Sequence, residues 1–106
     1  MIQVKNGVVF KVLKPQIYII LPVLDAIFAN YNVSCVITSA ADGTHKPDSF
    51  HYKHLALDLR SHHLPSEQAK LEVLQRLKDA LGEKYEVYLE NLGKESEHYH
   101  LEFDPK

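Results

Sequence analysis

The residues in this sequence that could do chemistry are concentrated in segment 49–60, SFHYKHLALDLR. Asp58 lies within a leucine-rich stretch, where a carboxylate is costly to bury unless a cation or a hydrogen-bond donor compensates it. A metal ion would provide that compensation, and His51 is close enough along the chain to approach the same point. An imidazole and a carboxylate are two of the ligands that a catalytic zinc ion accepts. We therefore expect His51 and Asp58 to be metal ligands.

A third ligand should come from another part of the chain, because three neighbours on one strand cannot surround an ion. Segment 97–103, EHYHLEF, supplies candidates. His98 and His100 share one face if this segment is extended, so either could ligate, and Glu97 reaches the same cleft if the strand begins with a bend. Two histidines, one carboxylate and an open position for water describe a hydrolytic zinc site. A second carboxylate would accept the proton of the water and pass it to the leaving amine.

Both segments resemble motifs of a known enzyme family. Segment 49–58 resembles the S-x-H-x-x-G-x-A-x-D signature of the zinc D-alanyl-D-alanine carboxypeptidases and dipeptidases, a family that includes phage L-alanyl-D-glutamate endolysins. The residues that fall on the signature are Ser49, His51, Ala56 and Asp58. Segment 97–100 matches the late E-x-x-H element of the same family, and residues 37–45, ITSAADGTH, are similar to the strand and loop before the signature. Two motifs in the expected order are more specific than either alone.

The resemblance implies that zinc is held by His51, Asp58 and His100, and that Glu97 is the general base. It implies hydrolysis of peptidoglycan stem peptides next to a D-amino acid, by a carboxypeptidase or an endopeptidase such as a phage lysis enzyme. It covers about the last two-thirds of the chain. The implied fold is the small α+β sheet shared with the hedgehog signalling domain.

The sequence departs from the family pattern at two places. The glycine of the signature is His54 here, and non-glycine residues rarely adopt the left-handed conformation that glycine allows. The loop before the signature lacks the arginine that polarises the substrate carbonyl in several members of the family. His45 or Lys46 could donate to the developing oxyanion instead, and we predict that His45 takes this catalytic role.

These departures favour an alternative from another functional class. The same zinc cleft could form a non-catalytic peptidoglycan-binding module. A virion structural component, in which the metal only braces the fold, is also compatible with the motifs.

Composition limits the other possibilities. The chain has 106 residues, seven histidines and a formal charge of -2, which predicts one domain over residues 1–106 that acts as a monomer. Acidic residues outnumber basic ones, so we expect neither nucleic acid nor a membrane surface as a partner. Cys35, the single cysteine, has no intrachain disulfide partner and lies in an apolar run, which predicts a buried, inert thiol.

No signal peptide or membrane-spanning stretch is visible in the sequence. We therefore expect synthesis in the cytoplasm without a signal peptide. Action on the cell wall would then follow release by another factor, and a phage or prophage product fits this expectation.

The elements that must position these residues follow from periodicity and turn signals. The expected strands are 2–4 and 8–12, joined as a hairpin by Asn6-Gly7, then 33–38, 55–59, 86–90 and 99–103. One helix should run from Pro15 to about Asn30 with a bend at Pro22, and another from Pro65 to Gly82. This order predicts an α+β fold in which two main helices cover one face of a small, mostly antiparallel sheet.

Overall fold

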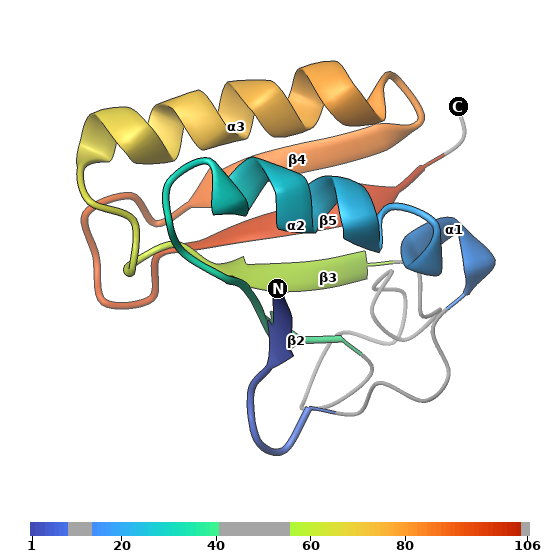
Figure 1. The fold of residues 1–106 in the computed structure, drawn as a ribbon, viewed down its shortest axis with the longest axis horizontal. Coiled ribbons are helices and arrows are strands. Elements are labelled where there is room, and N and C mark those ends of the chain that lie inside the picture. The colour runs from blue at the N-terminus through green and yellow to red at the C-terminus, as the bar shows by residue number, and fades with distance from the viewer. Residues whose placement is uncertain (9–13, 41–55, 105–106) are drawn as a thin grey trace.

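The computed structural model describes residues 1–8, 14–40 and 56–104 (Figure 1). The elements in chain order are β1 (Ile2–Val4), α1 (Pro15–Tyr18), α2 (Leu21–Ala29), β2 (Cys35–Ser39), β3 (Ala56–Arg60), α3 (Glu67–Leu81), β4 (Tyr85–Glu90) and β5 (His98–Phe103). The strands form one five-stranded sheet in the order β1-β2-β3-β5-β4. β1 is parallel to β2, and the other neighbours are antiparallel. The predicted α+β class is confirmed.

The N-terminal segment differs from the expected hairpin. β1 pairs in parallel with β2, with Ile2 opposite Cys35, a long-range pairing that the local sequence does not indicate. The expected turn is present at Asn6-Gly7, where Gly7 has a φ of 90° that glycine adopts without steric cost. Val8 is not in a strand, and the rest of the expected second strand lies outside the described residues.

The first predicted helix is interrupted where Pro22 requires it. Proline lacks the N–H that would bond to the carbonyl of the fourth residue before it, Tyr18, and its ring crowds that carbonyl. The helix accordingly divides into α1 and α2, with Ile19 and Ile20 in a turn between them. Ile20 is buried, so the interruption still places an apolar side chain in the core.

The helix α3 has clear signals at both ends. The Ser66 hydroxyl accepts a hydrogen bond from the backbone N–H of Ala69 at 3.1 Å, which caps the first turn. Gly82 follows the last turn with a φ of 80°. Ala69, Val73 and Leu77, spaced four residues apart, are buried. This stripe packs the helix on the sheet.

The helices α2 and α3 lie on the same face of the sheet (Figure 1). Alternation along β3 and β5 places Leu57 and Leu59, with Tyr99 and Leu101, in the core beneath these helices. The side chains between them therefore project from the opposite face. Cys35 is also part of the core, as predicted. None of the helices in the described ranges has the length and apolar character that a membrane crossing needs.

Candidate functional site

The centre of the candidate site is a contact between two neighbouring strands. Asp58 on β3 lies directly opposite His100 on β5, and both side chains project from the face away from the helices. His100 Nδ1 is 2.9 Å from Asp58 Oδ1, and each side chain is 18% exposed. The structure thus brings together two of the predicted ligands, which are 42 positions apart in the chain.

A carboxylate that the sequence analysis missed contacts the other nitrogen of His100. Glu102, two positions further along β5, has Oε1 3.3 Å from His100 Nε2. A histidine that binds metal through one nitrogen commonly donates from the other to a carboxylate, which orients the ring and raises its basicity. The alternation of His100 and Glu102 on one strand face is the sequence signal that could have revealed this residue. Tyr88 on β4 stacks on the His100 ring, with the ring centroids 6.4 Å apart.

This environment favours the protonated form of His100 in the absence of a metal. Burial would lower the pKa of His100, but the hydrogen bond to Asp58 and the charges of Asp58, Glu102 and Glu90 outweigh it and raise the pKa. A carboxylate can only accept a hydrogen bond, so two carboxylates facing one ring satisfy both N–H groups of an imidazolium. A metal ion that binds at Nδ1 must therefore displace a proton.

His98 lies beside this pair without completing it. Its Nε2 atom is 3.8 Å from Asp58 Oδ1 and 3.9 Å from Glu90 Oε1. Its Nδ1 atom is 2.8 Å from the carbonyl oxygen of Ser96. Of the two histidines that the sequence left open as ligands, His100 is therefore the one in hydrogen-bonding contact with Asp58.

The described residues supply part of the donor set that a zinc ion requires. Asp58 and His100 supply a carboxylate oxygen and an imidazole nitrogen that face each other, and both donor types suit zinc. Across the part of the chain that the structure describes, no group of three or more His, Cys, Asp or Glu side chains could hold a metal ion. His51, the third ligand that the resemblance implies, lies outside the described residues, and so does His45. The described pair supplies two of the three donor groups that the resemblance implies.

Glu97 is held in a different environment, against the helix α3. Its Oε1 atom accepts a hydrogen bond from Ser61 Oγ at 2.6 Å and forms an ion pair with Lys70 Nζ on α3 at 2.8 Å. Its Oε2 atom accepts from the backbone N–H of Gly93 at 2.9 Å. The side chain of Glu97 exposes no surface, so the carboxylate is enclosed by its donors.

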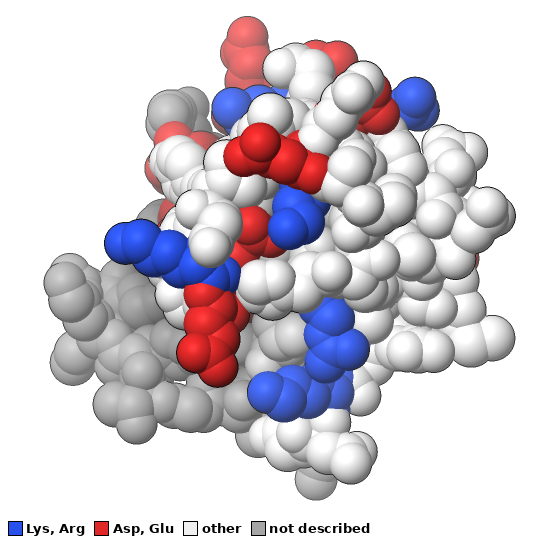
Figure 2. Space-filling model, turned by 90° about the vertical axis from the view of Figure 1, so that its left-hand side faces the viewer, with Lys and Arg blue, Asp and Glu red and all other residues white. Residues whose placement is uncertain are grey.

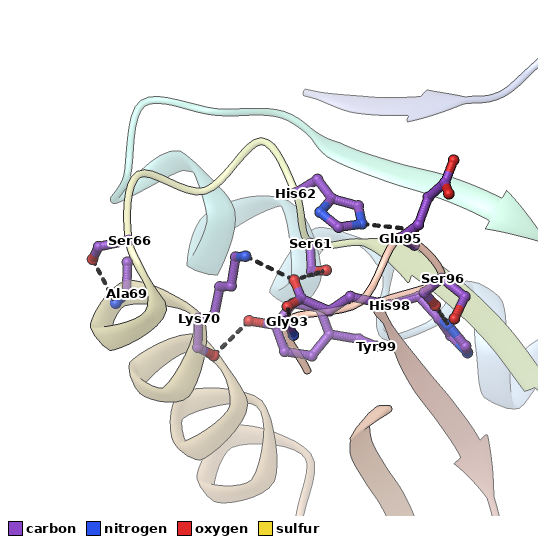
Figure 3. Close-up of polar contacts among 11 residues, drawn as sticks. Ser61, His62, Ser66, Ala69, Lys70, Gly93, Glu95, Ser96, His98 and Tyr99 are labelled. Atoms are coloured by element: carbon purple, nitrogen blue, oxygen red, sulfur yellow. Dashed lines mark hydrogen bonds and ion pairs between the residues drawn. The ribbon is translucent and has the colours of Figure 1, made fainter. Parts of the chain in front are cut away.

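These donors determine the charge state of Glu97. Burial would raise the pKa of the carboxyl group, but the hydrogen bonds from Gly93, Lys70 and Ser61 outweigh it and lower the pKa to about 2. The Tyr99 hydroxyl donates to the backbone carbonyl of Lys70, which adds a second link between β5 and α3 (Figure 3). None of these contacts reaches Asp58 or His100. Sequence analysis missed Ser61 and Lys70, because only the tertiary fold brings them to Glu97.

The contact between Asp58 and His100 joins the two motifs that carry the family resemblance. The 49–58 motif ends at Asp58 and the 97–100 motif ends at His100, and the strand register places these two ends opposite each other. Comparisons with family models, with curated proteins and with solved structures give no match for this chain. The interpretation of the site therefore depends on these residues and on their geometry.

Proposed function

We propose that this protein is a zinc-dependent metallopeptidase that hydrolyses peptidoglycan stem peptides next to a D-amino acid, on a fold of the hedgehog and D-alanyl-D-alanine peptidase type. The observation that carries the proposal is the 2.9 Å contact between Asp58 and His100. Two motifs that resemble the same family end at these residues. An accidental resemblance gives no reason for the motif ends to lie face to face.

In this proposal, zinc is held by His51, Asp58 and His100. When bound there, zinc would act as a Lewis acid toward water and toward the scissile carbonyl. The chain's own contribution begins with Glu102, which faces Nε2 of His100 and holds the ring with Nδ1 toward Asp58. His45 is proposed as a donor to the oxyanion that develops on the scissile carbonyl.

The position of Glu97 favours a structural contribution to the site. A carboxylate with a pKa of about 2 and three donors is a weak proton acceptor near neutral pH. By binding Lys70 and Ser61, Glu97 instead fixes the start of β5, and through β5 the position of His100. The role of general base, which the resemblance implies for Glu97, stays a prediction.

The same position of Glu97 favours a second candidate function. A protein whose expected base is engaged elsewhere could bind a peptide at a zinc cleft without hydrolysing it. The second candidate is therefore a non-catalytic, zinc-containing peptidoglycan-binding module. In either case we propose that the chain acts on the cell wall as a monomer, after release from the cytoplasm or as a phage product.

Digestion of purified peptidoglycan tests the proposal. Zinc-loaded protein is incubated with peptidoglycan, and new amino and carboxyl termini are identified by mass spectrometry. We expect new termini next to a D-amino acid, and none with a chelator or with His100→Ala. Lys84→Gln is the control and retains activity, because Lys84 is exposed and lies outside both the Asp58–His100 contact and the pocket beside it. Absence of new termini from zinc-loaded wild type would contradict the peptidase, and cosedimentation with peptidoglycan would then support the binding module.

A further inference from the structure

A polar groove of about 370 Å³ lies next to the Asp58–His100 pair and includes Asp58 and His98 in its lining. Part of its wall comes from three neighbouring strands, and the rest from the segment after β3 and the loop between β4 and β5. Lys5 follows β1, and its N–H donates to the carbonyl of Ile37, continuing the pairing with β2. Thr38 belongs to β2, and Arg60 is the last residue of β3. The sheet order β1-β2-β3 thus places two cations and a hydroxyl beside the candidate site.

The cations of this groove are available to a ligand. Lys5 and Arg60 are exposed, and within the described ranges neither forms an ion pair with a carboxylate. On the face drawn in Figure 2, basic side chains gather below the centre, with acidic side chains beside and above them. Two cations at the wall of one groove, neither of them paired with a carboxylate of the described residues, attract an anion.

Two of the three carboxylates in the described lining are already engaged by other side chains. Asp58 is paired with His100, and Glu97 is buried against Lys70. Glu95, on the loop between β4 and β5, is the remaining carboxylate among the described lining residues. The guanidinium of Arg60 presents a planar pair of N–H donors that matches the two oxygens of a carboxylate.

The spacing along β3 relates this groove to the reaction. Arg60 is two residues from Asp58 on the same strand face, a separation of roughly 7 Å between their Cα atoms. An extended peptide advances roughly 3.3 Å per residue. A ligand group at Arg60 would therefore lie one or two residues from a peptide bond held at Asp58 and His100.

We propose that Lys5 and Arg60 form a subsite for a carboxylate of the substrate, one or two residues from the scissile bond. The inference rests on the proposed function and narrows the substrate class to stem peptides that carry a free carboxylate at this distance. That carboxylate has two sources in such a peptide. One is the C-terminal carboxylate of a carboxypeptidase substrate, and the other is the free carboxylate of a D-glutamate residue within the stem.

Binding of matched acids and amides tests the subsite without relying on turnover. The probes are acetyl-D-alanyl-D-alanine and its C-terminal amide, and L-alanyl-γ-D-glutamyl-L-lysine with the D-glutamate carboxylate free or amidated. Affinities for the full chain are measured by isothermal titration calorimetry. We expect one acid to bind about tenfold more tightly than its amide, the gain typical of a charge-assisted hydrogen bond. The pair that shows the preference identifies the source of the carboxylate.

Variants locate that preference in the groove. Arg60→Gln should abolish the preference for the acid over its amide, and Lys5→Gln should reduce this preference, because each variant removes a cation from the lining. Lys84→Gln removes an exposed lysine outside the lining and should leave it unchanged. Equal binding of acid and amide in both pairs, absence of binding, or an unchanged preference in Arg60→Gln would overturn the subsite.

The binding and digestion experiments distinguish failure of the subsite from failure of the proposed peptidase activity. Zinc-dependent hydrolysis without an acid preference would overturn the subsite alone. An acid preference that depends on Arg60, without zinc-dependent hydrolysis, would support the subsite and overturn the peptidase.

Discussion

Asp58 and His100 face each other across β3 and β5, with His100 Nδ1 2.9 Å from Asp58 Oδ1. The antiparallel pairing of these strands creates the contact, since the two residues are directly opposed in the register. Glu102 faces the second nitrogen of the same ring. The arrangement gives His100 a defined orientation and places its Nδ1 atom beside a carboxylate, as a shared metal ion would require.

Asp58→Asn should lower the pKa of His100 in the metal-free protein. The substitution removes a negative charge and a charge-assisted hydrogen bond, both of which favour the imidazolium. The pKa is measured by NMR titration of the His100 ring protons. Glu95→Gln is the matched control and should leave this titration unchanged. A His100 pKa that is the same in Asp58→Asn and wild type would show that the two side chains do not interact in solution.

Glu97→Gln should destabilise the fold by about 2 to 4 kcal/mol, because it removes the charge of a fully enclosed carboxylate and leaves the partly buried Lys70 ammonium without a counter-charge. The free energy of unfolding is measured by urea denaturation. Lys70→Gln should cost a similar amount, and the double variant should cost less than the sum of the two. Glu95→Gln, an exposed neighbour, should change stability by less than about 0.5 kcal/mol.

The same variant separates the two roles of Glu97. If Glu97 is a positioning residue, its replacement lowers the free energy of unfolding, while the folded fraction keeps a substantial part of its kcat. If Glu97 is a general base, its replacement lowers kcat steeply at unchanged stability. The second result would contradict the structural role inferred from the contacts of Glu97.

Acid should destabilise wild-type protein through Glu97. The folded-state pKa is lowered from 4.5 to about 2, so the native state binds fewer protons than the unfolded chain between these values. The stabilisation is therefore fully present above about pH 4.5 and is lost as the pH falls toward 2. Urea unfolding across this range should show a shallower pH dependence in Glu97→Gln than in wild type. Parallel pH profiles would contradict the assignment.

Cys35 should be inert in the folded protein. Burial, aided by the negative charge of Asp25, raises the pKa of its thiol to about 12, and the side chain is fully enclosed. A rise from 9 to 12 lowers the thiolate fraction at neutral pH about a thousandfold. Labelling with a chromogenic disulfide reagent should therefore be slow in buffer and rapid in urea. Rapid labelling of native protein would show that the core around Cys35 opens readily.

Elements with strong local signals could be predicted from the sequence. Pro22 marks the break between α1 and α2, and Gly82 follows the end of α3. The alternation of leucines around Asp58 predicts which face of β3 is buried. Each of these signals acts over a few neighbouring residues, within one or two helical turns or within a single strand. They can therefore be recognised without knowing the rest of the fold.

Features that depend on tertiary pairing could not be predicted in this way. The parallel pairing of β1 with β2 joins distant segments without a local turn signal. Glu97 matches a catalytic motif, yet the fold turns its carboxylate toward Lys70 on α3. Nothing in the local sequence around Glu97 specifies the helix that packs there. The proximity of Asp58 and His100 was expected from the motifs, which predict that both bind one metal ion, whereas their direct contact and Glu102 emerged only from the structure.

Zinc titration tests the central claim most directly. Isothermal titration calorimetry of the metal-free chain should give one zinc ion per molecule, with release of a proton from His100 seen as a buffer-dependent enthalpy. Asp58→Ala and His100→Ala should each weaken zinc binding by at least about 100-fold, while His62→Ala should bind like wild type. Zinc binding that survives in both Asp58→Ala and His100→Ala, or no zinc binding by wild type, would contradict the account.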